Sequence, residues 1–324
     1  MKTMTAIAAL AASLCLATPT IAQEHDHGSH GAHGSHGAQP AQAHAGHGHQ
    51  HADFESGRFH VRVDGPAQPI GDVILIPGLT SSPDIWQGLT DELKGRYRVH
   101  RVHVQGFAGA EPMDNAAGPV AAPVAEDLAR YIAEQGLNKP VVIGHSMGGT
   151  IGMMLAARHP DSVGKLMVVD MVPFMGMMFG NPSATPESIA PVADQIHAGM
   201  SSGTREAYDT QAIMAINGMI NTESLRAGPI EDMRTSNQQT AANAYRELLV
   251  SDLRPELSRI TAPTTVLYVK FNYPGMTNEM VDGIYRGAFA TLPSAQLKRI
   301  DNSAHFIMLD QPAQFATEVN AFLE

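Results

Sequence analysis

The chain has 324 residues, of which 44% are hydrophobic and 16% charged, a balance that excludes a wholly disordered or fibrous protein. Its 21 lysine and arginine residues against 32 aspartate and glutamate residues give a formal net charge of −11, which argues against nucleic-acid binding and against electrostatic docking to anionic lipid. The single cysteine, Cys15, lies in the leading segment, so the remainder has no thiol for disulfides, zinc ligation or nucleophilic catalysis.

Residues 1–22 are typical of a secretory signal peptide. Lys2 supplies a positive charge, residues 7–17 form an almost unbroken apolar run, and Ala22 ends the segment with a small residue suited to cleavage. The apolar run is shorter than the roughly 20 residues that a membrane-spanning helix needs, so we expect export rather than a membrane anchor. A periplasmic or secreted location is therefore predicted.

Residues 23–52 form a low-complexity, histidine-rich tail. Its histidines are spaced by Gly, Ala, Ser and Gln, so the tail cannot bury enough apolar surface to offset its ordering entropy, and we expect disorder. Neutral imidazoles at short spacing bind Zn, Cu or Ni ions, although a floppy array imposes no fixed geometry. Metal capture and an inert solvated linker both fit the pattern. The first candidate ligands are His25, His27, His30, His33 and His36.

From residue 54 onward, strand and helix signals alternate along the chain. Apolar patterns typical of strands occur at residues 59–63, 72–76, 97–104, 141–143, 166–169, 265–270 and 296–300. Helical periodicity occurs at residues 83–93, 120–134, 147–158, 278–290 and 312–323. This alternation predicts βαβ units, and hence an α/β fold whose mainly parallel central sheet is flanked by helices over residues 53–324. Residues 172–258, which are methionine-rich and mostly helical, interrupt it and are predicted to form a helical cap insertion.

The clearest chemical signal is the sequence GHSMGG at residues 144–149. It contains G-x-S-x-G directly after a predicted strand and at the start of a predicted helix, which is the context of a nucleophile elbow. The tight turn projects the Ser146 hydroxyl above the sheet, and glycines flank it because a Cβ there would collide with neighbouring backbone. The amides at the start of the helix point at the site, where they stabilise developing negative charge. We predict Ser146 as a nucleophile.

With this elbow, the chain from about Arg58 to its C-terminus resembles the α/β-hydrolase superfamily. The resemblance implies a triad in which the serine comes first along the chain and the histidine last. Residues 302–306 resemble the loop that holds the catalytic histidine, which implicates His305. Residues 76–79 resemble the oxyanion loop, although Pro77 replaces the family's usual histidine there. The resemblance implies that the backbone amides of Leu79 and Met147 hold the oxyanion.

The acidic member of the triad has two candidates. The family usually places it after the strand here at residues 265–270, but the following loop carries no carboxylate before Glu279, which is expected to open a helix. Asp170 ends the strand that follows the elbow helix, and some superfamily members take their acid from that strand. We therefore predict Asp170. The alternatives are Glu279 as the acid and an ordinary turn-capping role for Asp170.

These residues together predict a secreted serine hydrolase that cleaves carboxylic esters through an acyl-enzyme. No metal or organic cofactor is required, and the expected partner is a small-molecule ester. We expect Trp86, Phe174 and Met175 to contact it. A lactonase, a cofactor-free perhydrolase or a C–C hydrolase would use the same groups. A different alternative is a non-catalytic periplasmic protein that binds metal through its histidine-rich tail, since a fold alone does not prove activity.

Overall fold

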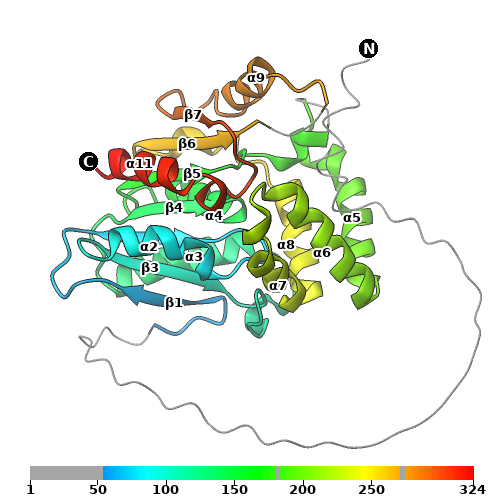
Figure 1. The fold of residues 1–324 in the computed structure, drawn as a ribbon, viewed down its shortest axis with the longest axis horizontal. Coiled ribbons are helices and arrows are strands. Elements are labelled where there is room, and N and C mark those ends of the chain that lie inside the picture. Colours follow the sequence, from blue (N-terminus) through cyan, green and yellow to red (C-terminus); the bar gives the residue numbers. More distant parts are fainter. Residues whose placement is uncertain (1–53, 180–182, 271–273) are drawn as a thin grey trace, which may run out of the picture.

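The computed structural model describes residues 54–179, 183–270 and 274–324 (Figure 1). The predicted signal peptide at 1–22 and the histidine-rich tail at 23–52 lie outside these residues. Within the described ranges, no helix combines the length and the apolar character that a membrane span requires.

The described residues form a seven-stranded sheet in the order β1-β3-β2-β4-β5-β6-β7. Every neighbouring pair is parallel except β1 with β3, which is antiparallel at one edge, so the predicted mainly parallel sheet is confirmed. The strands are β1 (Phe59–Asp64), β2 (Asp72–Ile76), β3 (Arg98–Val104), β4 (Val141–His145), β5 (Lys165–Val169), β6 (Thr264–Val269) and β7 (Gln296–Ile300).

Helices cover both faces of the sheet, which explains why its central strands read as continuous apolar runs. Successive side chains of a strand point to opposite faces, so Val73 and Leu75 of β2 pack on one core while Ile74 and Ile76 pack on the other. The first core is closed by α2 (Gln87–Leu93) and α11 (Pro312–Leu323). The second is closed by α3 (Ala121–Glu134), α4 (Met147–Arg158) and α9 (Asn278–Ala288).

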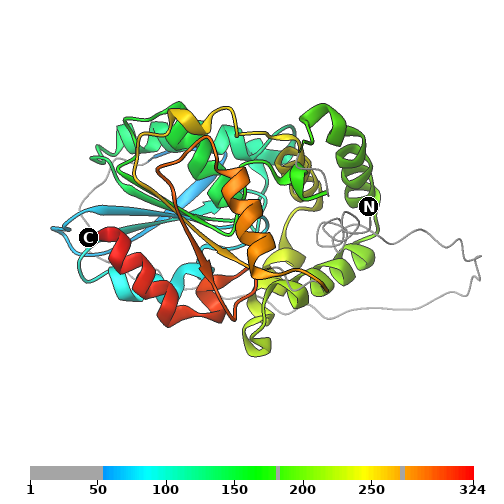
Figure 2. The same cartoon turned by 90° about the horizontal axis from the view of Figure 1, so that it is seen from above.

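Between β5 and β6 the chain forms a cap, whose helices gather beyond the carboxyl ends of the parallel strands (Figures 1 and 2). Its main helices are α5 (Pro186–Ser202), α6 (Arg205–Met219), α7 (Ala227–Thr235) and α8 (Gln238–Val250). All but α7 begin after a polar residue whose side chain accepts a backbone amide of the first turn, namely Thr185, Thr204 and Asn237. Short 3₁₀ turns occupy Met175–Phe179, Glu223–Leu225 and Leu257–Arg259.

A buried carboxylate fixes the cap to the core. The side chain of Glu247, on α8, accepts hydrogen bonds from the amides of Val120, Ala121 and Ala122 at 2.6, 2.7 and 2.8 Å. These amides open α3 and have no partner within their own helix, and the carboxylate also faces the positive end of the helix dipole. The cap therefore docks on α3 through a charge-assisted helix cap.

Candidate active site

Ser146 occupies the turn between β4 and α4 with φ 52° and ψ −120°, a conformation that non-glycine residues rarely adopt. Hydrogen bonds on both sides hold it there. Its amide donates to the carbonyl of Val169 at 2.9 Å, and its carbonyl accepts from the amide of Gly149 at 2.8 Å. These hydrogen bonds thus hold Ser146 in a strained conformation, as is common for strained residues at functional sites.

Backbone contacts explain the glycines of the elbow. A Cβ on Gly144 would lie 2.1 Å from the carbonyl oxygen of Gly148, and one on Gly148 would lie 2.1 Å from the carbonyl oxygen of Ile76. A Cβ on Gly78 would approach the Ser146 Cβ to 3.1 Å. The loop after β2 therefore packs directly against the nucleophile turn, at a distance that only glycines permit.

Asp170 and His305 meet at the carboxyl ends of the strands. His305 Nδ1 and Asp170 Oδ2 are 2.6 Å apart, a short hydrogen bond in which the ring nitrogen donates to the carboxylate. Asp170 directly follows β5 with φ 51°, and its side chain is only 2% exposed. The amide of Val269 and the hydroxyl of Tyr285 both donate to Asp170 Oδ1, at 3.1 and 3.0 Å. Both oxygens of the buried carboxylate thus accept hydrogen bonds.

Glu279 has a different position. It lies in the first turn of α9, where hydrogen bonds from its own amide and the Thr277 side chain lower the pKa of its carboxyl group. Glu279 is exposed, and its side chain is not part of the wall of the cavity described below. Of the two acid candidates, the structure brings Asp170 to His305.

The backbone of the His305 loop is held by two residues that the sequence did not identify. His145 Nε2 donates to the carbonyl oxygen of His305 at 3.1 Å, while burial, with His305 beside it, keeps the pKa of His145 well below its usual value and the ring neutral. The carboxylate of Asp310 accepts the amides of Ala304 at 2.9 Å and of Thr222, on the cap, at 2.9 Å. The loop is therefore tied to both β4 and the cap.

The two predicted oxyanion donors flank Ser146. Met147 is the first residue of α4, so its amide has no acceptor one turn earlier in the helix. Leu79 lies in the loop that packs against Ser146 and lines the cavity. Within the described part of the chain, neither amide donates a hydrogen bond to another protein group. This position is compatible with the predicted role of both amides.

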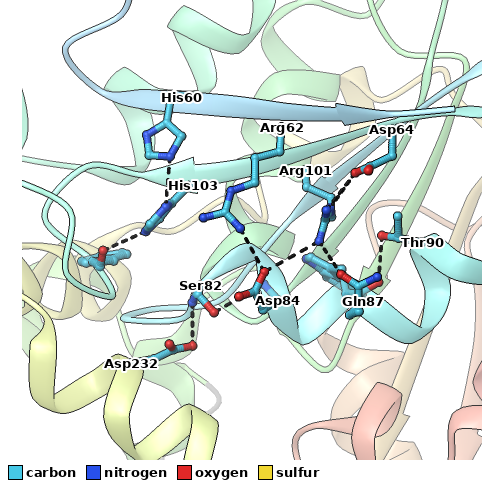
Figure 3. A network of polar contacts seen from close by, with 12 residues as sticks. His60, Arg62, Asp64, Ser82, Asp84, Gln87, Thr90, Arg101, His103 and Asp232 are labelled. Atoms are coloured by element: carbon cyan, nitrogen blue, oxygen red, sulfur yellow. Dashed lines mark hydrogen bonds and ion pairs between the residues drawn. The ribbon is translucent and has the colours of Figure 1, made fainter. Parts of the chain in front are cut away.

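The cap also contacts the loop after β2, which contains Leu79 (Figure 3). Asp232, on α7, accepts a hydrogen bond from the amide of Ser82 at 2.8 Å, just after the predicted oxyanion loop. Burial raises the pKa of Asp232 despite this hydrogen bond. The hydroxyl of Ser236 accepts the amide of Ala108 at 2.9 Å and donates to the carbonyl of Asp232 at 2.7 Å, with the carbonyl of Thr80 farther away at 3.3 Å. Hydrogen bonds thus join the cap to the segment that follows the predicted oxyanion loop.

A cavity of about 660 Å³ lies between the cap and the carboxyl ends of the strands, and Ser146, Asp170 and His305 all line it. No hydrogen bond joins the side chains of Ser146 and His305 among the described residues; such contacts are often long before substrate binds. Lys270 and Asp301 supply charges to its wall. Six methionines also line it, namely Met171, Met175, Met178, Met214, Met219 and Met233.

Of the three predicted substrate contacts, only Met175 lines this cavity. Trp86 is fully buried and stacks on Phe315, with ring centroids 6.1 Å apart, in the core between the sheet, α2 and α11. Phe174 is also fully buried, under the guanidinium of Arg254 at 4.7 Å. Neither ring reaches the cavity wall, which corrects the expectation that they contact substrate. Both large rings instead fill the core.

The predicted tail ligands His25, His27, His30, His33 and His36 lie outside the described residues. Among residues 54–179, 183–270 and 274–324, no group of three or more histidine, cysteine, aspartate or glutamate side chains is arranged to hold a metal ion.

Known proteins resemble this chain over most of its length. A model of the alpha/beta hydrolase family matches residues 73–318. A pimeloyl-[acyl-carrier protein] methyl ester esterase from Aeromonas hydrophila subsp. hydrophila is 27% identical over 256 residues, covering 78% of this chain and 95% of that protein. The corresponding esterase from Vibrio cholerae serotype O1 is 24% identical over 264 residues, covering 81% of this chain and 94% of that protein.

Solved structures show the same fold. The enol-lactonase from Burkholderia xenovorans LB400 superposes with a TM-score of 0.66 at 18% identity, covering 82% of this chain and 96% of that one. A thermophilic esterase from Thermogutta terrifontis gives a TM-score of 0.62 at 22% identity, covering 82% of this chain and 92% of that one.

Proposed function

The chain belongs to the α/β hydrolase family, and from that premise we propose that it is a serine carboxylesterase whose triad is Ser146, His305 and Asp170. The observation that carries the proposal is the 2.6 Å hydrogen bond between His305 and the buried Asp170, in a cavity that Ser146 also lines. Curated relatives with 27% and 24% identity carry the name of an ester-cleaving enzyme, which agrees with this reaction class.

In the proposed reaction, Ser146 Oγ attacks the ester carbonyl carbon and passes its proton to His305 Nε2. The carbonyl oxygen becomes an oxyanion held by the amides of Leu79 and Met147, and Asp170 stabilises the imidazolium. Collapse of the intermediate breaks the bond to the alkoxy group, which leaves as an alcohol with the proton from His305. Water then attacks the acyl-enzyme by the same steps, releasing the carboxylic acid and restoring Ser146.

We propose that the substrate presents an apolar group to the cap side of the cavity. Flexible, polarisable thioethers adapt to irregular apolar shapes, and six methionines line this wall. Short acyl chains would leave much of the wall uncovered, so hexanoate esters should be better substrates than acetate esters. Equal rates for the two would count against a selective apolar cavity.

The test is a panel of nitrophenyl esters of graded chain length, with a lactone and an amide included, run on the wild type and on Ser146→Ala. The variant removes one buried-turn hydroxyl, so we expect loss of turnover and of labelling by a fluorophosphonate probe with an unchanged melting temperature. Turnover near the wild-type rate in folded Ser146→Ala would refute the mechanism. Cleavage of the lactone alone would reassign the substrate class.

We also propose that residues 1–22 direct export and are removed. Cell fractionation together with N-terminal sequencing of the mature protein tests this. Recovery of the uncleaved chain in the cytoplasm would contradict it.

A further inference from the structure

Tyr285 contacts the proposed triad without a role in the reaction described above. It belongs to α9, is 1% exposed, and donates its hydroxyl hydrogen to Asp170 Oδ1 over 3.0 Å. The amide of Val269 donates to the same oxygen at 3.1 Å, whereas Asp170 Oδ2 accepts from His305 at 2.6 Å. The carboxylate thus has one oxygen bound to the scaffold and the other bound to the histidine.

The ring that carries this hydroxyl is itself held in place. Tyr285 stacks on Tyr268 with centroids 4.1 Å apart and planes 18° apart, and lies nearly parallel to Phe289 at 6.5 Å. Burial, together with the Asp170 carboxylate, raises the pKa of Tyr285 well above its ordinary value. The hydroxyl therefore stays protonated and acts as a hydrogen-bond donor to Asp170.

We infer that Tyr285 is a positioning residue: its hydroxyl fixes the Asp170 carboxylate so that Oδ2 faces His305. This inference rests on the proposed function. The terminal torsion of an aspartate is broad, so two donors on Oδ1 restrict a rotation that the backbone alone leaves free. The loop after β6, where the family usually carries its acid, has no carboxylate before Glu279. Instead α9, which follows this loop, contributes the hydroxyl of Tyr285, which donates to Asp170 at the end of the neighbouring strand β5.

Loss of the hydroxyl has two expected consequences. The carboxylate rotates more freely, which lowers kcat. It also loses a donor that disperses its negative charge, so it favours the charged form of His305 and moves the acid limb of the kcat/KM profile to higher pH. In the described part of the chain, the other ionisable groups around His305 are His145, with ring centroids 4.5 Å apart, Asp310, which accepts the amide of Ala304 at 2.9 Å, and Lys270 and Asp301 in the same cavity wall. Tyr285→Phe changes none of them.

The experiment compares Tyr285→Phe with the matched control Tyr268→Phe. Each change removes one hydroxyl from the same stacked pair, but the hydroxyl of Tyr268 donates to Asp282 at 2.9 Å rather than to Asp170. For Tyr285→Phe we expect kcat to fall about 10-fold at unchanged KM, since a hydrogen bond to a charged group is involved, and the acid limb to move to higher pH. The control should match the wild type in both measurements.

A folded Tyr285→Phe variant with wild-type kcat and a wild-type acid limb would overturn the inference. If the wild type hydrolyses no ester, the proposed function fails, and proton NMR decides the inference by itself. The His305 Nδ1–H resonance should move downfield in Tyr285→Phe and stay in place in Tyr268→Phe; an unmoved resonance in both refutes a positioning role. If Tyr285→Phe does not fold, wild-type protein labelled with fluorotyrosine, a stronger donor, should show an upfield shift, and no shift would refute it.

Discussion

At the scale of single residues, four non-glycine residues of the cavity wall have positive φ. Thr80 (60°), Ser146 (52°), Asp170 (51°) and Asn302 (58°) each follow a strand or its loop at the carboxyl edge of the sheet. Each of these residues changes the direction of the chain where the strand ends, so that a side chain or a backbone amide faces the cavity. Backbone hydrogen bonds hold two of these residues, since the amide of Ser146 donates to Val169 at 2.9 Å and that of Asp170 donates to Leu267 at 2.7 Å.

Asp170→Asn should lower kcat far more than Glu279→Gln. The amide keeps the size of the side chain but removes the charge that orients and stabilises the imidazolium of His305. In a serine protease with a Ser-His-Asp triad, the same change costs about 10⁴ in kcat, or about 5 kcal/mol, and this is the upper expectation here. Glu279→Gln removes a charge at an exposed helix start and should leave kcat unchanged.

Kinetics of both variants, after their melting temperatures have been compared, check this assignment. Asp170 is buried with three hydrogen-bond donors around it, so a folding defect must be separated from a chemical one. Folded Asp170→Asn that keeps most of its activity, with Glu279→Gln inactive, would move the acid to the position usual in the family.

At the scale of elements, two carboxylates, one buried and one half-buried, join segments that are far apart in the sequence. Glu247 binds α8 to the start of α3, and Asp310 binds the His305 loop to the cap. Both carboxylates accept backbone amides rather than pairing with arginine or lysine. Amides are fixed in direction, so these contacts set the orientation of the cap more strictly than flexible surface ion pairs would.

Glu247→Ala should destabilise the protein by about 3 kcal/mol, because it leaves the first amides of α3 without an acceptor in a dry environment. Denaturant unfolding measures this. The matched control is Glu231→Ala on α7, whose carboxylate is 62% exposed and 3.5 Å from Arg234, and which should cost well under about 1 kcal/mol. Equal effects of the two substitutions would show that Glu247 does not anchor the cap.

At the scale of the whole molecule, the two ends of the parallel strands carry different groups of polar residues. The carboxyl end carries the cavity, whereas the amino end of β2 and β3 carries a partly buried ion-pair cluster. There Asp72 accepts hydrogen bonds from Arg98 at 2.6 Å and from His100 at 3.1 Å. Although burial raises it, these hydrogen bonds lower the pKa of Asp72 to about 2. The cluster can therefore be changed without touching the cavity.

Asp72→Asn should cost about 1–2 kcal/mol of stability at neutral pH, after allowance for solvent screening, with ester turnover unchanged. Because the pKa of Asp72 is lower in the folded chain than the ordinary 3.8, its contribution is present above that value and disappears as the pH falls towards about 2. Unfolding measured along this pH range should show the wild type and the variant converging. A constant difference would exclude the charge as the cause.

Deletion of residues 23–52 should leave ester hydrolysis nearly unchanged and remove most binding of divalent metal ions. The proposed reaction uses no metal, whereas the deleted segment carries closely spaced histidines. Isothermal calorimetry with Zn²⁺ and the nitrophenyl ester assay check the two halves. Loss of turnover after deletion, or after addition of a chelator, would require a metal-dependent mechanism.

The sheet, its helices and the elbow could be predicted from the sequence, because they follow from local patterns. Apolar runs of strand length, helical periodicity and G-x-S-x-G act over a few residues, and β7, α4 and α11 begin and end where the sequence predicts. The four-residue helix α10 (Ile307–Asp310) was not predicted, since one turn is too short to show a period.

Which groups meet in space depended on the packing of the whole chain. Asp170 and His305 are 135 residues apart, and Tyr285 and Asp170 are 115 apart, so no local pattern connects them. The burial of Trp86 and Phe174 likewise depends on Phe315 and Arg254, which lie on distant segments. Such contacts form when parallel strands bring their carboxyl ends to one edge and the cap closes over it. The local sequence therefore specified the candidate groups, while packing of the sheet selected their partners.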